Sequence, residues 1–241
     1  MKLQILIFFL FCSFAVSAKR ISFEFGIGIG YQPKMQLKQT GSASQNVFKP
    51  RGFPSFGLNG AIGYKLNAQN VFGISAGFVT VPFLYTFDLT GTNFAANNPD
   101  ISKKGNTQGD NLAIDLGIFY RRYLLQRSKM NFFAEVIPTV RLNSSGSLAY
   151  SMGVGNSQDS VTVFHVIFKE PKMINLGGRL NIGVKKSLKR NYLILNLFYT
   201  RVLPEITGQY FTMINTPDFN YGTLSLINHQ FGVAFKFGFG K

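Results

Sequence analysis

The chain has 241 residues, of which 46% are hydrophobic and 15% aromatic, and its formal net charge is +15. Its length fits one large all-β domain or two small ones. So strong a positive charge suggests a nucleic acid, an anionic membrane surface or an acidic partner. No recognisable nucleic-acid-binding motif carries the Lys and Arg residues, which argues against a soluble nucleic-acid binder.

The first segment, MKLQILIFFLFCSFAVSAKR, predicts a secretory signal peptide. Lys2 precedes an apolar run over residues 3–16, and the small-residue pattern Val-Ser-Ala follows as a cleavage site. This run is too short for a spanning helix. We therefore expect cleavage of residues 1–18 and a single mature domain over 19–241. Cys12 lies inside the run, and the bulky residues before it argue against a lipoprotein signal that would retain it.

Eight later segments alternate apolar residues with small or polar ones. In ISFEFGIGIGY, Phe23, Phe25 and Ile27 share one face, and Glu24 lies on the other with several glycines. A period of two predicts a β-strand with one apolar face. Each segment has about ten residues, the length that a tilted strand needs to cross a bilayer. The predicted strands are 21–31, 55–66, 71–81, 111–123, 131–142, 173–185, 192–201 and 229–241.

Short and long connections alternate along these strands. Short turns on one side and long loops on the other are typical of an outer-membrane barrel. A soluble β-sandwich or lipocalin-like barrel is the alternative, but its outer face would be covered with charge. Here the face opposite the apolar one carries Gly, Ala, Ser and Asn, which favours a narrow lumen. The short connections are 67–70, 126–129 and 187–191, and the long ones lie near 32–52, 88–111, 143–171 and 203–226.

These patterns predict an all-β fold: an eight-stranded antiparallel up-and-down transmembrane β-barrel with short periplasmic turns and long extracellular loops. The C-terminal segment HQFGVAFKFGFGK would be an aggregation hazard as a free edge. In a closed barrel it pairs with the first strand instead. Pro138 falls inside the fifth strand, where we expect a bulge or local bend because proline lacks an N–H donor.

The Phe-, Tyr-, Asn- and Lys-rich segment GIFYRRYLLQRSKMNFFAEV is similar to small outer-membrane β-barrel proteins of Gram-negative bacteria. The composition of this segment resembles that of Bacteroidetes members of these proteins, including the PorT-like group tied to protein secretion and gliding. That resemblance implies an integral protein of the cell outer membrane that belongs to a secretion or envelope-assembly complex. The chain departs from the family habit of ending on an aromatic residue, since Gly240 and Lys241 follow Phe239.

Charged residues on the inward phase predict a network inside the lumen. Burial of a lone charge is costly, so we expect pairing, with Glu135 beside Arg179 and Glu24 beside Lys236. Such a network would close the lumen with polar side chains; a narrow ion path or a proton-sensing gate is the alternative. The predicted network comprises Glu24, Asp115, Glu135, Arg141, Arg179 and Lys236, with Lys185 as a further inward candidate.

The short turns and adjoining strand ends carry many cations and no Asp or Glu. Basic residues at a lipid interface often extend toward phospholipid phosphates. The alternative is a docking ring for an acidic periplasmic partner. The predicted basic periplasmic rim consists of Lys65, Arg121, Arg122, Arg127, Lys129, Lys185, Lys186, Lys189 and Arg190.

The sequence offers no convincing catalytic site. His165 and His229 are the only histidines, and neither has a Ser two residues along or another positioned partner. No cluster has metal-ligand spacing, and FGIGIG is not followed by a helix as a phosphate loop requires. We therefore expect a non-enzymatic barrel without a cofactor, in contact with outer-membrane lipids, that acts through its extracellular loops or its basic rim. A secretion component, a small porin and a lipid-modifying enzyme are the alternatives.

Overall fold

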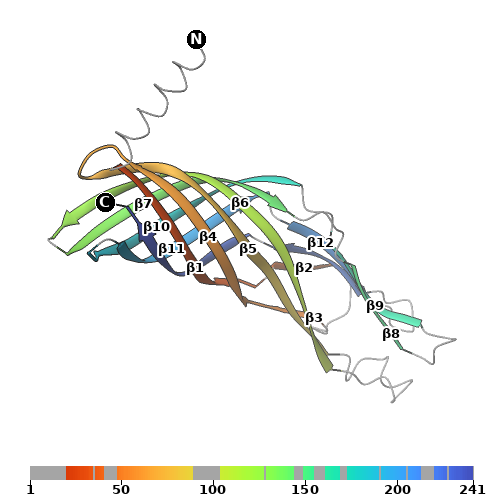
Figure 1. Ribbon diagram of the computed structural model, residues 1–241. Helices are drawn as coiled ribbons and strands as arrows, with labels where there is room; N and C mark the ends of the chain where they lie inside the picture. Colours follow the sequence, from red (N-terminus) through yellow and green to blue (C-terminus); the bar gives the residue numbers. More distant parts are fainter. Residues whose placement is uncertain are drawn as a thin grey trace, which may run out of the picture.

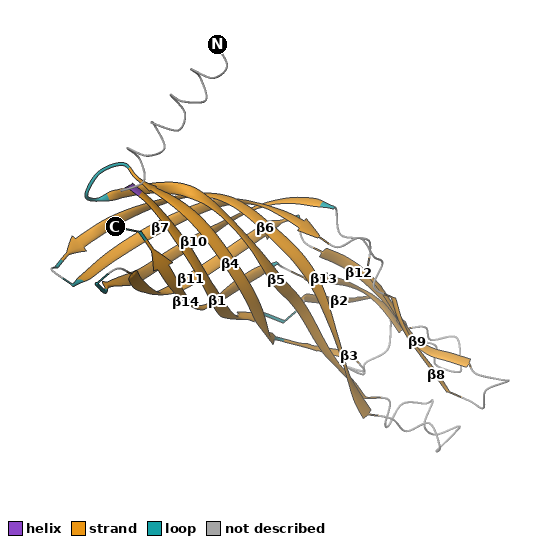
Figure 2. Cartoon of the chain, in the orientation of Figure 1, coloured by secondary structure: helices purple, strands orange, loops and turns teal. Residues whose placement is uncertain are grey.

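A computed structural model describes residues 20–34, 36–40, 48–88, 104–127, 129–143, 149–154, 161–168, 173–189, 191–204, 206–212, 220–226 and 228–240. The predicted signal peptide lies outside the described residues. Nearly all of the described chain is β-strand (Figure 2). Among the described residues, no helix is long and apolar enough to cross a membrane.

Eight long strands close into an antiparallel barrel, which confirms the predicted fold (Figure 1). The main sheet has nine strands, but β3 (Phe48–Arg51) pairs only with the end of β5, so eight form the wall. Pairing of β5 with β6 completes the ring. The wall strands, in chain order, are β1 (Ile21–Gln32), β4 (Phe53–Lys65), β5 (Asn70–Asp88), β6 (Lys104–Gln126), β7 (Met130–Asn143), β10 (Ile174–Ser187), β11 (Asn191–Leu203) and β14 (His229–Phe239).

The first and last wall strands pair as the sequence predicts. Phe23 of β1 lies opposite Phe239 of β14, and Tyr31 lies opposite Phe231. Strand β14 also pairs with β11 on its other side. The Phe-rich C-terminal segment therefore has no free edge, which removes the template that an exposed strand offers to other chains.

Three tight turns join wall strands at the barrel end where β1 begins and β14 finishes (Figure 1). In the β4–β5 turn, the side chain of Asn67 accepts hydrogen bonds from the backbone N–H groups of Gln69 and Asn70, both at 2.9 Å. This local bonding is the usual reason for Asn in tight turns. Because outer-membrane barrels place their short turns in the periplasm, we call this end the periplasmic end.

A second sheet stands at the opposite end of the molecule (Figure 1). The sequence predicts long loops there, with a strand extension only over residues 161–168, so a five-stranded sheet is a correction. Its strands are short, and β5 and β6 also run past their predicted bounds because they pair with each other from Asn70–Arg122 to Asp88–Lys104. In sheet order, the five strands are β2 (Gln36–Thr40), β13 (Asn220–Leu226), β12 (Ile206–Thr212), β9 (Val161–Phe168) and β8 (Ala149–Val154).

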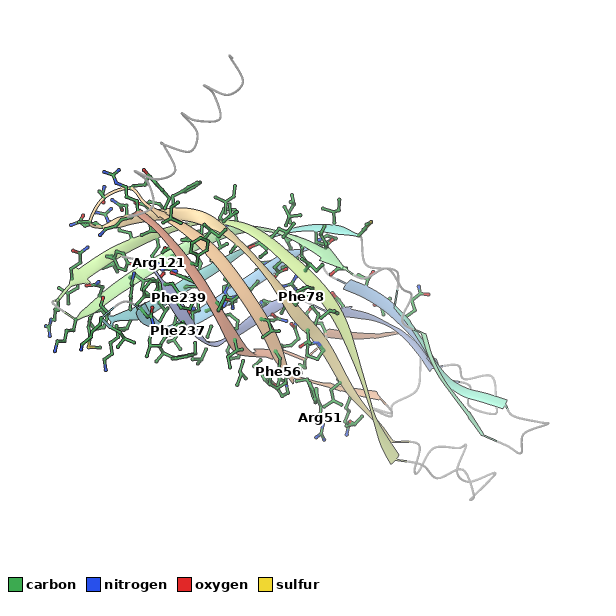
Figure 3. All side chains as sticks on the ribbon, viewed as in Figure 1. Arg51, Phe56, Phe78, Arg121, Phe237 and Phe239 are labelled. Atoms are coloured by element: carbon green, nitrogen blue, oxygen red, sulfur yellow. The ribbon has the colours of Figure 1, made fainter. Side chains whose placement is uncertain are left out.

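The outer wall of the barrel is apolar. Ile27, Leu58 and Ile74 expose 55%, 59% and 57% of their surface, and Phe56 and Phe78 lie on the same outer face (Figure 3). The residues between them point inward and are buried, as the strict alternation along β11 illustrates. So much exposed apolar surface around a closed barrel is compatible with lipid and not with water.

The bulge expected at Pro138 is absent, and the alternative of a local bend stays a prediction. Pro138 pairs in register with Gly178 of β10, and its ladder with β6 keeps the same register on both sides of the proline. The register shift in β6 falls between Tyr123 and Leu125 instead. The ladder between β6 and β7 omits the pairs at Ile137 and Pro138 without inserting a residue, so strand β7 tolerates the missing donor.

Candidate functional site: a charged lumen and a basic mouth

Arg121 lies in the periplasmic half of the barrel (Figure 3). Its buried side chain is at the centre of an ionic cluster in the lumen. Its Nη1 and Nη2 donate to the two oxygens of Glu24 at 2.6 and 2.8 Å. Its Nε donates to Oε2 of Glu135 at 2.7 Å. Arg121 and both carboxylates are almost fully buried, at 1%, 2% and 3% exposure. Bidentate bonding of this kind is the strongest geometry available to a guanidinium.

Further polar groups complete this cluster. The Nζ of Lys236 lies 3.7 Å from Glu24 and 3.8 Å from Glu135. Tyr192 donates its hydroxyl to Glu24 at 3.1 Å, and Asn181 donates its amide to the remaining oxygen of Glu135. Both carboxylates are therefore saturated with donors, which buried charges require.

An apolar layer surrounds the ionic cluster. The guanidinium of Arg121 lies 4.7 Å from the ring centroid of Phe133 and 5.4 Å from that of Phe119, within cation–π range. Phe119, Phe133 and Ile194 are themselves fully buried. An eight-stranded barrel leaves an interior that side chains just fill. We call this cluster and its apolar surround, in the periplasmic half, the lumen plug. Its buried members are Ala61, Val71, Phe119, Tyr123, Phe133, Ile137, Tyr192 and Ile194, together with Glu24, Arg121, Glu135, Asn181 and Lys236.

A separate ion pair occupies the extracellular half of the lumen. Arg141 donates from Nε and Nη2 to the two oxygens of Asp115 at 2.7 and 2.8 Å. Its Nη1 donates to Oδ1 of Asn228 at 2.9 Å, next to the start of β14. Asp115 keeps 24% of its side chain accessible, whereas Arg141 is buried.

Arg179 does not pair with Glu135, so that prediction is wrong. Across the β7–β10 ladder, Glu135 lies opposite Asn181, and Arg179 lies two residues further up, opposite Ile137. Arg179 donates from Nε to Asn181 at 3.0 Å, and its guanidinium stacks 4.1 Å from the ring centroid of Phe198. The other predicted pair, Glu24 with Lys236, is adjacent in the structure.

A cavity of about 60 Å³ lies above the lumen plug. Its lining includes Asp115, Arg179 and Lys236, with Thr200 and Gln230 among the neutral polar side chains. A volume of this size holds a few water-sized molecules and gives no room for a large solute.

The predicted rim divides into different positions. Arg121 belongs to the lumen plug, which corrects its assignment to the rim; the alternation of β6 itself places it on the inward phase with Asp115 and Phe119. Arg122 and Lys186 are exposed and lie on the outward phase of their strands. The exposed residues Arg127, Lys129 and Lys189 lie in or beside the tight turns, and Arg190 lies outside the described residues.

Inward-phase cations, together with Lys189 of the β10–β11 turn, surround a cavity of about 310 Å³ at the periplasmic end, which we call the basic mouth. Arg20, Lys65, Lys185 and Lys189 line it, and Arg121 lies at its floor. The Nζ of Lys185 lies 3.5 Å from the ring centroid of Tyr192. Among the described lining residues there is no Asp or Glu. Sequence reasoning missed Arg20, which shares the inward phase of Ser22 and Glu24.

The two histidines lie apart from these sites. The Nδ1 of His229 lies 3.3 Å from the hydroxyl of Tyr199 on the neighbouring strand β11. His165 belongs to β9 of the second sheet, and its side chain is outside the description. In the part of the chain that the structure describes, no group of three or more His, Cys, Asp or Glu residues is placed to hold a metal ion.

A closed antiparallel barrel with an apolar wall and a polar interior defines the class of protein. The chain is an integral outer-membrane β-barrel protein.

No protein-family model and no curated protein sequence matches the chain. Among solved structures it is similar to the outer membrane protein OprG from Pseudomonas aeruginosa, with 12% identity, a TM-score of 0.48, and coverage of 93% of this chain and 99% of that one. Neisserial surface protein A is similar with 11% identity, a TM-score of 0.38 and coverage of 89% and 94%. The outer membrane protease OmpT from Escherichia coli is similar with 11% identity, a TM-score of 0.37, and coverage of 92% of this chain and 97% of that one. Likenesses this loose decide nothing about function, which has to rest on the residues of this chain.

Proposed function

We propose that the protein is a closed, non-conducting, non-enzymatic outer-membrane barrel that binds an acidic segment of a periplasmic protein at its basic mouth. The observation that carries the proposal is the set of inward-phase cations around a concave site with no carboxylate among its described lining residues. A concave site lined by one sign of charge concentrates its field and attracts ligands of the opposite sign.

Lipid binding does not account for these cations. Arg122 and Lys186 have outward phase and suit contact with phospholipid phosphates at the bilayer surface. Lys65 and Lys185 instead line the cavity on the barrel axis, where the wall strands separate them from lipid. The periplasmic cations therefore form two sets, and the inward set needs a partner from the periplasm.

The basic mouth is a docking site and not a channel entrance, because the lumen plug closes the barrel beneath it. Arg121 at its floor is held by Glu24 and Glu135 within hydrogen-bond distance. A ligand bound there remains on the periplasmic side, where the mouth contributes electrostatic steering and specificity.

Binding of a fluorescent peptide of ten Glu residues to the purified protein in uncharged detergent tests this proposal. The mouth variant Lys65→Glu/Lys189→Glu reverses two exposed charges that line the mouth. We expect fluorescence anisotropy to show about tenfold weaker binding, equivalent to about 1.4 kcal/mol, and a smaller salt dependence.

The lipid-facing variant Arg122→Glu/Lys186→Glu is the matched control, since it changes the net charge by the same amount at the same end of the barrel. It should retain affinity within about twofold, because surface charges outside the contact contribute little. Equal losses in both variants, or no loss in either, would contradict docking at the mouth.

Planar-bilayer recording tests the closed lumen independently. The purified protein should give no steady single-channel currents, because buried side chains occupy the periplasmic half of the lumen. Steady unitary currents would favour the small-porin alternative and leave the peptide experiment to decide on docking.

The PorT-like role in a secretion or envelope-assembly complex is the second candidate, and the basic mouth favours it because such a complex supplies a periplasmic partner. Crosslinking in native membranes distinguishes this complex-bound role from that of a barrel that docks a periplasmic protein on its own. A fixed stoichiometric complex that the mouth variant loses and the lipid-facing variant keeps supports membership in a complex. A lipid-modifying activity would appear as a lipid A change upon deletion of the protein.

A further inference from the structure

We infer that the extracellular half of the lumen binds a small inorganic monovalent anion, of which chloride is the physiological example, in the cavity lined by Arg179 and Lys236. The inference rests on the lumen charges and does not depend on the function proposed for the basic mouth.

Most of the inward-facing charges are paired. In the lumen plug, Glu24 and Glu135 are matched by Arg121 and Lys236, so two negative and two positive charges cancel. In the extracellular half, Asp115 and Arg141 form one closed pair. Among the described groups inside the barrel above the basic mouth, Arg179 is left with a positive charge and no carboxylate within 4.0 Å.

The guanidinium of Arg179 makes few described contacts. Its Nε donates to Asn181, and its Nη2 is buried with no hydrogen-bond acceptor among the described atoms. The ring of Phe198 offers one cation–π contact. That contact stabilises a cation much less than a carboxylate does, and the half-buried guanidinium has lost part of its hydration without gaining a counter-charge.

A small cavity lies beside Arg179. The cavity of about 60 Å³ accommodates a halide with a few waters and excludes larger organic anions. Lys236 also lines it, and its contacts to Glu24 and Glu135, at 3.7 and 3.8 Å, are longer than hydrogen bonds. Its ammonium donors are therefore available to a ligand in the cavity.

The charges around the cavity favour an anion over a cation. Asp115 is the one described carboxylate of the lining, and both of its oxygens already accept from Arg141. A cation in the cavity would meet two positive charges and no free carboxylate. An anion would neutralise Arg179 and give Lys236 an acceptor at hydrogen-bond distance.

The test uses bromide, which replaces chloride and scatters anomalously. The refolded protein in uncharged detergent is crystallised with sodium bromide, and data are collected at the bromine absorption edge. We expect an anomalous peak in the lumen cavity within hydrogen-bond distance of the Arg179 guanidinium. Ordered waters there without bromide, or bromide only at the basic mouth, overturn the inference.

A solution experiment supports the crystallographic one. The urea midpoint of unfolding is measured in sodium bromide and in sodium gluconate of equal ionic strength, since gluconate is too large for the cavity. The midpoint should rise with bromide, because a ligand that binds only the folded state stabilises it. Arg179→Met, which keeps an apolar stem without the charge, should lose this dependence. Arg122→Met, which removes one exposed charge from the outer wall, should keep it.

Either of two results would contradict the site. In the first, bromide shifts the urea midpoint of Arg179→Met as much as that of the unmodified protein. In the second, bromide does not shift the midpoint of the unmodified protein. If Arg179→Met does not refold, Arg179→Gln serves in its place, and the crystallographic peak in the unmodified protein decides by itself.

Discussion

The two halves of the lumen treat an inward-facing arginine in opposite ways. In the periplasmic half, Arg121 is surrounded by two carboxylates and two aromatic rings, at 1% exposure. In the extracellular half, Arg179 is only half-buried, lies against one ring and a cavity, and has one hydrogen bond to Asn181.

The residues opposite each arginine produce this difference. Arg121 lies directly across from Glu135, while Arg179 lies between Ile137 on one side and Thr200 on the other. A two-residue step along a strand keeps the same face but changes the cross-strand partner. Inward phase therefore selects which side chains share the lumen, and register decides which of them can form a pair.

Replacement of Arg121 should have the largest effect. Arg121→Met leaves Glu24 and Glu135 buried with Lys236 as their one described cation, at 3.7 and 3.8 Å, and with one neutral hydrogen bond each, from Tyr192 and Asn181. Removal of one partner from a buried ion pair typically costs about 3–5 kcal/mol. Urea unfolding in lipid vesicles, followed by loss of the folded band on a cold gel, should show a loss of that size or a failure to fold.

The adjacent arginine provides the control for this variant. Arg122 follows Arg121 in β6 but is exposed on the outer wall. Arg122→Met should change stability by no more than about 0.5 kcal/mol. Similar destabilisation by both substitutions would mean that the lumen plug does not hold the fold together.

The sequence was sufficient to predict the barrel because lipid imposes one simple rule on every wall strand. Outward positions must be apolar, so the alternation around Phe23 and Phe25 repeats in each strand. The second sheet was missed because no such rule acts beyond the bilayer. Its short segments, such as β8 and β12, carry too few residues for the period to stand out from loop composition.

The lumen residues could be predicted as a set but not as pairs. Glu24 and Lys236 lie near the junction of the first and last strands, so chain closure alone brought them together. The partner of Glu135 depends on register, which strand lengths estimated from sequence do not fix to within two residues. The sequence prediction places Arg121 on the rim because it lies at a strand end that adjoins a short turn, although the period of β6 points inward.

A methyl group added to the lumen plug should have the second-largest effect. A Cβ on Gly183 would approach Cβ of Asn196 to 2.6 Å and Cζ of Phe133 to 2.8 Å, with the backbone oxygen of Leu195 at 2.5 Å. The closely packed side chains and backbone there leave no space for the added methyl group. Gly183→Ala should cost about 1–3 kcal/mol, as overpacking of a dense core does, in the same urea assay. An unchanged midpoint would show that the periplasmic half is looser than these contacts require.

Arg179→Met should have a much smaller effect than Arg121→Met. The substitution loses the bond to Asn181 and the contact with Phe198, but it also removes a charge that has no described counter-charge. These effects oppose each other, so we expect a change within about 1 kcal/mol when gluconate is the only anion. A loss as large as that of Arg121→Met would remove the distinction between the two halves.

The smallest effect should come from a methyl group added on the extracellular side. A Cβ on Gly28 would lie 3.5 Å from Cε1 of Phe198 and 3.6 Å from Cβ of Ala234, at ordinary contact distances beside the cavity. Because alanine restricts the unfolded chain more than glycine, Gly28→Ala should stabilise the protein by about 0.5 kcal/mol. The sign is therefore opposite to that of Gly183→Ala, although both substitutions add the same group to the same inner face of the barrel. If both variants lost stability equally, the density of the lumen would be uniform along its axis, and the cavity beside Arg179 would be too small for an anion.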